Sequence, residues 1–302
     1  MRVAVVANPA SGRGKGGKLI PRVEETLSAL GVDHTMLISR DGSDPERLAR
    51  QAAEDGAGVV AALGGDGHVG NVANGVIGTG AALAVIPAGT GNDFARHIGL
   101  DRKDPLAATR LLADPRTRRI DVVRVRTSEG ERYFVNVAGT GFDSQVNEHA
   151  NGVTFLKGTP KYIYSTFVTL ARFTPGQFRI KVDGQERTFP GMLVAVGNGE
   201  SYGGGMKVTP GARSDDGVLD LCVLGAVSKF TFVKTFPKVF SGRHVDHPSV
   251  EMLRGREIEI SAERPFEVYG DGERFGRLPA TFTVVPDGLS IVAPPPPTAA
   301  AG

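Results

Sequence analysis

Apolar and polar residues along the first 120 positions follow two alternating periods. Short continuous apolar runs predict buried strands, and the segments between them repeat apolar residues at helical spacing. The strands are predicted at 2–7, 32–39, 58–63 and 82–86, and the helices at 18–30, 44–54 and from 67 to about 77. This alternation favours a three-layer α/β domain with a mostly parallel sheet.

The pattern changes near Asp121, where short runs rich in Val, Ile, Phe and Tyr take over. These runs lie at 121–126, 132–138, 178–182, 191–196, 218–224, 256–261, 265–269 and 281–285, with helical stretches at 160–173 and 228–241. Such a series favours an antiparallel β-sandwich or barrel. We therefore predict an α/β domain at 1–121 and a mainly β domain at 122–293, whose last strand can return to the first domain. The Pro- and Ala-rich residues 294–302 predict a disordered tail.

Composition narrows the class of protein. Glycine accounts for 41 of the 302 residues, roughly double the usual share of about 7%. Because no collagen-like period accompanies them, these glycines indicate tight turns and backbone held close to ligands. A single cysteine excludes a disulfide framework and a cysteine-based zinc site. The formal charge of 35 − 33 = +2 leaves no basic surplus that would point to nucleic acid as a partner.

Targeting signals are also lacking in the sequence. No apolar stretch approaches the roughly 20 residues that a membrane span needs. Residues 1–6 lack the long apolar core and the cleavage site of a signal peptide, and they predict a first strand instead. We therefore expect a protein of the reducing cytoplasm.

A first glycine-rich loop follows the strand at 2–7. Residues 12–17 fit the dinucleotide pattern G-x-G-x-x-G, but the acid expected about 20 residues later is missing, since the second strand ends in Ile38-Ser39-Arg40. The loop also nearly fits a P-loop ending in Lys18, but Leu19 replaces the hydroxyl that would hold magnesium. A basic glycine turn at a helix start still suits a phosphate. A flexible surface turn is the alternative.

Two further loops follow the third and fourth predicted strands. In residues 64–67, Gly-Gly-Asp-Gly, bare amides can approach an anion while Asp66 binds Mg²⁺ through water; a simple Asp-Gly turn is the alternative. In residues 87–96, Thr90 offers a hydroxyl to a phosphate, and Asn92 can cap the next helix. Because ligands in open α/β sheets bind at the carboxyl ends of strands, the three loops together predict a phosphate site.

Taken in order, these segments resemble the diacylglycerol kinase family of bacterial soluble lipid kinases, and the actinobacterial members in particular. The likeness runs from residue 3 to about 285. The matching motifs are N-P-x-S-G at 8–12, G-G-D-G at 64–67, P-x-G-T-G-N-D-F-A-R at 87–96, G-x-G-F-D at 139–143, N with Y-G-G-G-M at 198 and 202–206, P-x-A-x-x-x-D-G-x-L-D over 210–220, and D-G-E at 271–273. The resemblance implies an α/β domain like that of NAD kinases and phosphofructokinases, followed by a β-sandwich domain.

It also implies ATP-dependent phosphorylation of the hydroxyl of diacylglycerol to phosphatidic acid. By the resemblance, Asp271 is the base that takes the hydroxyl proton, Glu273 orients Asp271 or binds metal, and Asp66 holds a metal near the phosphates; a hairpin turn is the alternative for Asp271. The nucleotide residues it implies are Asn8, Pro9, Ser11, Gly12, Ser39, Gly64, Gly65, Asp66, Gly67, His68, Asn71, Gly89, Thr90 and Asn92.

A second Mg²⁺ site is implied by the family at Asp215 and Asp216. There the Asp216 carboxylate would act with the carbonyls of Arg213 and Val218, and Asp215 would link by water toward Asp66. Hard oxygen ligands on a tight glycine turn suit Mg²⁺. An acidic turn before the strand at 218–224 is the alternative.

One segment departs from the family signature, which continues G-G-D-G-T-x-N-E. Here the chain continues His68-Val69-Gly70-Asn71, so the threonine hydroxyl and the glutamate are lost. His68 can still donate to a phosphate and Asn71 can still hydrogen-bond. The alternative is that His68 has no role in binding and is a partly exposed residue at a helix start.

The partners follow from the same resemblance. The substrate would be a lipid alcohol, reached by transient contact with the inner membrane face, and a homodimer is one option for assembly. The aromatic and basic helices at 160–173 and 228–241 can either dock on an anionic membrane or simply pack on the core. Cys222 is expected to be a small buried hydrophobe. The rival functions are a kinase for a sphingoid base or ceramide, an NAD kinase, and a nucleotide-binding protein without catalysis.

Overall fold

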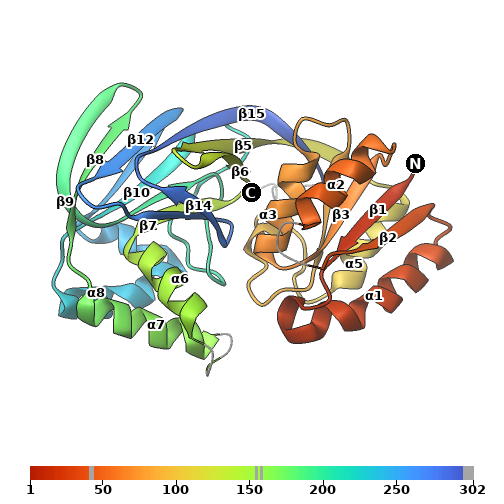
Figure 1. The fold of residues 1–302 in the computed structure, drawn as a ribbon, viewed down its shortest axis with the longest axis horizontal. Coiled ribbons are helices and arrows are strands. Elements are labelled where there is room, and N and C mark those ends of the chain that lie inside the picture. The colour runs from red at the N-terminus through yellow and green to blue at the C-terminus, as the bar shows by residue number, and fades with distance from the viewer. Residues whose placement is uncertain (41–43, 154–155, 157–158, 295–302) are drawn as a thin grey trace, which may run out of the picture. The chain divides into compact units, whose positions relative to one another are not determined.

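The computed structural model describes residues 1–40, 44–153, 156 and 159–294. Two compact units make up the chain. Among the described residues, the first contains Met1–Val122 together with 286–294, and the second contains Val123–Val285. Figure 1 shows helices beside the strands in both units. Apart from Pro294, the predicted tail at 294–302 lies outside the described residues.

The first unit is built on a parallel sheet. Its strands are β1 (Val3–Ala7), β2 (His34–Ile38), β3 (Val59–Gly64) and β4 (Ala82–Pro87), in the order β2-β1-β3-β4. The end of β15 (Ala280–Val292) joins this sheet beside β4, where Ile291 pairs with Leu83. Strands β1, β3 and β4 are buried along their whole length, which explains their continuous apolar sequences. The expected three-layer α/β architecture is confirmed.

The helices of the first unit are α1 (Ser11–Ala29), α2 (Asp44–Glu54), α3 (Asp66–Val76), α4 (Asp93–His97) and α5 (Pro105–Arg110), and a 3₁₀ turn, η1 (Leu111–Ala113), follows. Helix α1 begins earlier than the predicted residue 18. Its opening is kinked, because Gly12, Arg13 and Gly14 adopt left-handed backbone angles. Apolar spacing could not predict this segment, which carries no apolar side chain. From the same helix, Leu19, Val23 and Leu27 enter the core.

The second unit is an antiparallel β structure, as predicted. Its strands are β5 (Thr117–Thr127), β6 (Gly130–Phe134), β7 (Val137–Gly141), β8 (Gly176–Val182), β9 (Gln185–Gly197), β10 (Leu219–Gly225), β11 (Val250–Gly255), β12 (Glu257–Ala262), β13 (Glu267–Gly270) and β14 (Glu273–Arg277). The main path runs β14-β13-β7-β9-β8-β12-β15, and β10 lies between β9 and β11. One apolar cluster, which includes Phe134, Phe178 and Phe282, fills its core.

Helices α6 (Phe142–Gly152), α7 (Thr159–Arg172) and α8 (Lys229–Thr235) belong to the second unit, with 3₁₀ segments η2 (Phe236–Ser241) and η3 (Arg243–Asp246). In Figure 1 the three helices gather along one side of the second unit. The ring of Phe142 contacts the rings of Phe173 and Phe232, with centroids 5.4 and 4.8 Å apart. Aromatic side chains therefore anchor these helices to the core.

Several predicted segments differ in extent from the observed elements; the runs at 121–126 and 191–196, for example, are the longer strands β5 and β9. The run at 132–138 is two strands, because the amides of Val135 and Asn136 bind a carboxylate instead of a neighbouring strand. The stretch at 228–241 changes from α-helix to 3₁₀-helix around Pro237, which lacks an amide hydrogen. The run at 281–285 extends to Val292 through a kink at Asp287, which resembles a turn in sequence. Helix α6 and strands β11 and β14 were not predicted.

Among the helices described, none combines the length and the apolar character that a transmembrane span requires.

Candidate functional site

Three loops of the first unit lie at one edge of its parallel sheet. They follow β1, β3 and β4, whose registers set Ala7 opposite Leu63 and Gly64 opposite Pro87. The Asn8 amide donates to the Leu63 carbonyl at 3.0 Å, and the Ala88 amide donates to the Gly64 carbonyl at 2.8 Å. The carboxyl edge of such a sheet is where α/β proteins bind their ligands.

Glycines bring the backbones of these loops into direct contact. A Cβ atom placed on Gly12 would lie 2.1 Å from the Ala88 carbonyl oxygen. One placed on Gly89 would lie 2.5 Å from the Gly65 Cα atom. Any side chain at these two positions would therefore push the loops apart.

Polar residues of the first loop bind the loop itself. The Asn8 side-chain oxygen accepts from the Ala10 amide at 2.9 Å, and the Pro9 carbonyl accepts from the Gly17 amide at 3.0 Å. The Ser11 amide donates to the Asn8 carbonyl at 3.2 Å, and the buried Ser39 hydroxyl donates to the Ala7 carbonyl at 3.1 Å. Asn8 and Ser39 thus shape the edge at which a ligand would bind.

Asp66 connects the second loop to the third. Its Oδ1 accepts from the Phe94 amide at 3.2 Å, at the start of α4. Burial, together with the negative charge of Asp93, raises the pKa of Asp66. Asn92 closes the third loop: its side chain accepts from the Gly89 amide at 2.9 Å and donates to the Gly89 carbonyl at 3.0 Å. The Thr90 side chain remains exposed at the tip.

The departure from the family signature lies in the interior of the first unit. His68 is only 6% exposed, so the interpretation of a partly exposed residue was wrong. Its Nε2 donates to the Val6 carbonyl at 2.8 Å, and burial lowers the pKa of the ring. The ring packs against Gly64, where a Cβ atom would lie 2.4 Å from it. Asn71 is likewise buried. His68 therefore ties α3 to β1 as a neutral side chain.

In the second unit, Asp271 lies at the turn between β13 and β14, with a left-handed φ of 51°. Its Oδ2 accepts from the Val135 amide at 2.7 Å. Its Oδ1 accepts from the Asn136 amide at 3.1 Å and the Val137 amide at 3.3 Å. Three backbone donors therefore fix the orientation of the carboxylate. These amide donors lie far from Asp271 in the sequence. They are what distinguishes this Asp-Gly pair from an ordinary hairpin turn.

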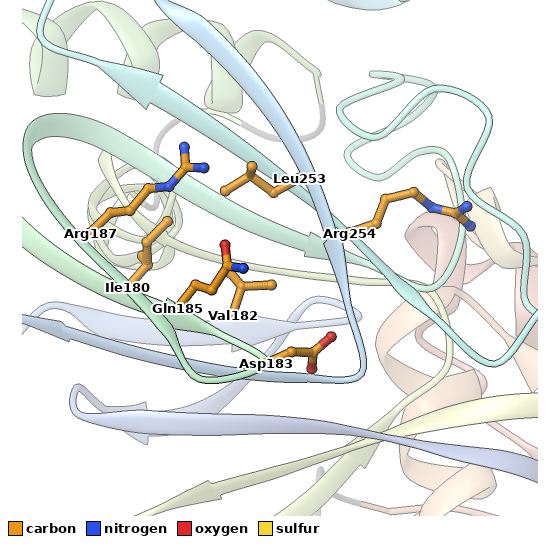
Figure 2. A pocket seen from close by; sticks show the side chains of 7 residues that line it. All are labelled: Ile180, Val182, Asp183, Gln185, Arg187, Leu253 and Arg254. Atoms are coloured by element: carbon orange, nitrogen blue, oxygen red, sulfur yellow. The ribbon is translucent and has the colours of Figure 1, made fainter.

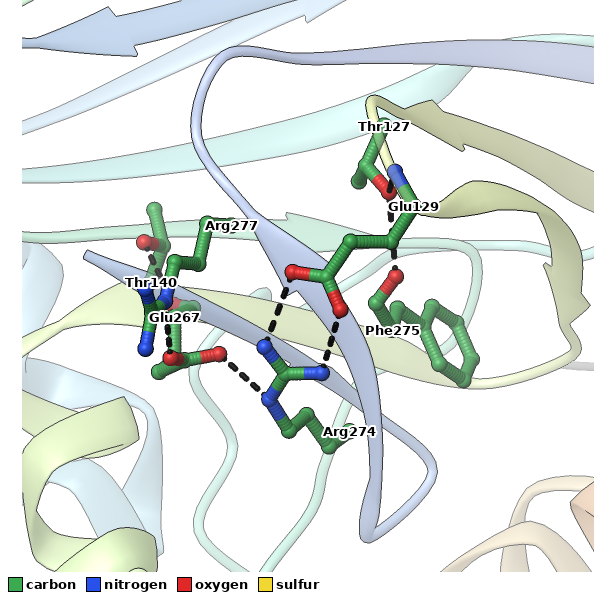
Figure 3. Close-up of polar contacts among 7 residues, drawn as sticks. All are labelled: Thr127, Glu129, Thr140, Glu267, Arg274, Phe275 and Arg277. Carbon is green, nitrogen blue, oxygen red and sulfur yellow. Dashed lines mark hydrogen bonds and ion pairs between the residues drawn. The ribbon is translucent and has the colours of Figure 1, made fainter. Parts of the chain in front are cut away.

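An ion-pair network holds the β13–β14 hairpin in place (Figure 3). The Arg274 guanidinium donates to both Glu129 oxygens, at 2.6 and 2.9 Å, and contacts Glu267 at 2.6 Å. Arg277 reaches the other Glu267 oxygen at 2.7 Å, and the Thr127 hydroxyl donates to the Phe275 carbonyl at 3.2 Å. The network attaches the hairpin to the β5–β6 turn, a contact that sequence reasoning missed.

Glu273, one position before Arg274, was predicted to assist Asp271. Burial raises the pKa of Glu273, and the positive charge of Arg132 opposes that shift. The carboxyl group therefore holds a proton at a higher pH than an exposed glutamate would.

The acidic loop predicted to bind Mg²⁺ is engaged by arginines. Asp216 Oδ1 accepts from the Val218 amide at 3.2 Å, and its Oδ2 pairs with Arg254. Asp215 pairs with the Arg213 side chain at 3.0 Å. Within the described ranges, no group of three or more His, Cys, Asp or Glu residues is arranged to hold a metal ion. Carboxylate and carbonyl oxygens suit Mg²⁺ chemically, and the Mg²⁺ site at this loop, where Arg254 pairs with one Asp216 oxygen, stays a prediction.

A cavity of about 180 Å³ lies near this loop, against β8, β9 and β11 (Figure 2). Its lining residues are Ile180, Val182, Asp183, Gln185, Arg187, Leu253 and Arg254. Arg254 is shared with the Asp216 ion pair. None of the predicted site residues lines this cavity.

A buried carboxyl that sequence reasoning noted only as part of a motif stands at the start of α6. Asp143 accepts from the Ser144 amide at 2.8 Å and from the Tyr202 hydroxyl at 3.3 Å. Burial raises the pKa of Asp143 to about 7. Cys222 is buried as predicted, and burial followed by the Asp143 charge raises the pKa of its thiol to about 12.

The chain thus combines an α/β unit that carries three glycine-rich loops with a β unit that contributes the oriented Asp271 carboxylate. The model of the diacylglycerol kinase catalytic domain matches residues 2–125, and that of the YegS C-terminal NAD kinase beta sandwich-like domain matches residues 136–293. The chain belongs to the diacylglycerol kinase family.

Individual relatives agree with this assignment. The chain is 36% identical to a diacylglycerol kinase of Mycobacterium tuberculosis, over 97% of this chain and 95% of the relative. It is 27% identical to a diacylglycerol kinase of Bacillus subtilis, over 97% and 96%. A crystal structure of a diacylglycerol kinase from Bacillus anthracis shares the fold, with a TM-score of 0.74 and 22% identity over 97% of both chains.

Proposed function

We propose that this protein is an ATP-dependent lipid kinase that phosphorylates the free hydroxyl of diacylglycerol to give phosphatidic acid. The observation that carries the proposal is the 36% identity, over nearly the whole chain, to a relative named diacylglycerol kinase. The loop geometry of the first unit and the oriented Asp271 carboxylate of the second support the same chemistry.

The first unit is proposed to hold the nucleotide. Gly12, Gly65 and Gly89 lie where their backbones can approach phosphate oxygens without a side chain in the way. Thr90 offers an exposed hydroxyl at the same edge. Phosphoryl transfer is mostly positioning and charge neutralisation, and backbone amides supply both without a lysine surplus. We propose the magnesium complex of ATP as the form used, since kinases use metal to neutralise the phosphates.

Asp271 is proposed to accept the proton of the attacking hydroxyl. In the reaction, the lipid oxygen forms a bond to the γ-phosphorus, the bond from that phosphorus to the β–γ bridging oxygen breaks, and ADP leaves. Three backbone amides donate to the two carboxylate oxygens of Asp271 and fix its orientation, and a carboxylate held in place can accept a hydroxyl proton as transfer proceeds. Glu273 is proposed to support the orientation of this hairpin.

The location of the enzyme follows from its substrate. We propose that it works at the inner membrane face and leaves it after each encounter. The homodimer that the sequence leaves open has a direct test: sedimentation should give twice the 31.8 kDa of one chain if it forms.

The decisive experiment incubates the purified chain with radiolabelled ATP, Mg²⁺ and diacylglycerol in mixed micelles. Labelled phosphatidic acid is the expected product. Parallel micelles carry a sphingoid base or ceramide, and an Asp271→Asn variant controls for contaminating kinases. Product only from a sphingoid base or ceramide would replace the proposed substrate. Nucleotide binding without product from any lipid would favour the non-catalytic rival.

A further inference from the structure

Aromatic residues of the second unit face solvent around α8 and η2. The sequence left open whether the stretch at 228–241 docks on a membrane or packs on the core. The structure shows both buried and exposed apolar residues there. Phe232 and Val239 are buried, whereas Phe230 is 79% exposed and Phe240 is 52% exposed. Val233 follows Phe230 by three positions and is 45% exposed. Since positions three or four apart share one side of a helix, Phe230 and Val233 form an outward apolar face. We call Phe230, Val233 and Phe240 the apolar face.

An exposed fraction as large as that of Phe230 is unusual for a phenylalanine side chain. A phenylalanine side chain gains free energy when it leaves water, and contiguous exposed apolar residues commonly mark interaction sites. Phe230 forms none of the ring contacts that link Phe232, Phe236 and Phe240 to one another. Packing within the described part of the chain therefore does not explain why position 230 is a phenylalanine.

Basic residues predominate in the sequence around the apolar face. Between Asp220 and Asp246 the sequence contains no acidic residue, and it contains three lysines and Arg243. Lys234 and Lys238 are exposed, and neither forms an ion pair within the described part of the chain. Lys229 donates to the Ala171 carbonyl at the end of α7, so it joins α8 to α7. Helix α7 adds another exposed aromatic residue, Phe167, at 55%.

We infer that the apolar face, with Lys234 and Lys238, is the surface by which this protein docks on an anionic lipid bilayer. Apolar side chains that enter the boundary of the acyl chains, flanked by cations that face lipid phosphates, are the pattern of interfacial helices. Lys234 and Lys238, which form no ion pair with the described residues, complement a leaflet rich in anionic lipids. The inference rests on the proposed function in one respect, that the substrate lies in a membrane.

The test measures binding apart from catalysis. The wild-type chain is sedimented with vesicles of phosphatidylcholine containing 30 mol% phosphatidylglycerol, without diacylglycerol or ATP. Phe230→Ser is expected to lower the partition coefficient roughly tenfold, because one buried aromatic ring is lost. Lys234→Glu with Lys238→Glu is expected to lower it further and to remove its salt dependence. Leu30→Ser and Lys103→Glu, on exposed positions of the first unit, are the matched controls and should bind as the wild type does.

Activity on a short-chain diacylglycerol, dissolved as monomers, separates the two ideas. Variants of the apolar face should keep wild-type turnover on this dissolved substrate and lose turnover on vesicles. Equal vesicle binding by Phe230→Ser and the wild type would overturn the docking surface, even if the kinase activity is intact. Self-association lost in Phe230→Ser, with no vesicle binding by the wild type, would also overturn it in favour of a second copy. Absence of turnover on every lipid would instead count against the proposed function.

Discussion

The candidate sites of the two units are formed by different groups: mainly backbone in the first unit and carboxylate side chains in the second. In the first unit the loops are mostly backbone, packed so closely that Gly12 and Gly89 have no room for a methyl group. The polar side chains Asn8, Ser39 and Asn92 bind neighbouring main chain. Such a site is sensitive to the shape of the chain more than to the charge of any one residue.

In the second unit the polar residues of interest are carboxylates, and each has a different set of partners. Asp271 is held by three backbone amides, and Asp216 is paired with Arg254. Asp143 forms no ion pair with the described residues, and burial raises its pKa to about 7. Added volume should therefore damage the first unit most, whereas altered charge should damage the second.

The largest expected effect is that of volume in the first unit. Gly12→Ala forces a Cβ atom against the Ala88 carbonyl at a left-handed φ of 57°. We expect a loss of about 3 kcal/mol in the free energy of unfolding and at least a 100-fold loss of ATP affinity, measured by urea denaturation and calorimetry. Gly14→Ala is the matched control, because its φ is also positive but its Cβ would meet open space. Equal losses in both variants would show that backbone angle, and not contact between the loops, explains the glycines.

Charge in the second unit comes next. Asp271→Asn keeps the size of the side chain but presents an amide group to backbone donors and removes the proposed base. We expect turnover to fall at least about 100-fold while ATP affinity stays within about twofold. Steady-state kinetics with calorimetric ATP titration measures both. Turnover that survives the change would falsify the assignment of Asp271 as base and leave it a purely structural anchor. Glu273→Gln, two positions away at the start of β14, should cost less.

Asp143 gives the second unit a pH-dependent stability. Because burial raises its pKa to about 7, the folded chain binds a proton that the unfolded chain has released above the ordinary pKa of 3.8. The contribution to stability is complete below the unfolded pKa and is lost as the pH rises through the folded value. Between pH 5.5 and 8 the free energy of unfolding should therefore fall by about 2 kcal/mol more in the wild type than in Asp143→Asn. Parallel urea midpoints for both proteins across this range would contradict the buried proton.

The difference between the units also explains what the sequence could predict. Continuous apolar strands such as 58–63 and the glycine loops after them are local signals, so the sheet of the first unit and the loops at its carboxyl edge were predictable. The partners of Asp271 are not local, because they lie more than 130 positions earlier in the chain. The same holds for Glu129 and Arg274, which are 145 residues apart. The strand break at Val135 depends on that distant carboxylate, so apolar spacing could only merge β6 with β7.

His68 tests most directly whether the loops of the first unit act through their backbone. Its substitution is expected to have the smallest effect. If the loops act through backbone, the loss of this ring should alter packing and leave the nucleotide nearly untouched. His68→Thr removes the hydrogen bond to the Val6 carbonyl and leaves space beside Gly64. We expect a loss of about 1–2 kcal/mol in the free energy of unfolding and a change of less than about threefold in the KM for ATP.

His68→Gln serves as the matched variant, because its longer amide can still donate to the Val6 carbonyl. It should recover part of the stability that His68→Thr loses and, like that variant, leave the KM for ATP nearly unchanged. A rise in the KM of tenfold or more in both variants would mean that the ring contacts the phosphates. In that case the first unit would depend on side-chain chemistry after all, and the contrast between the two units would fail at this residue.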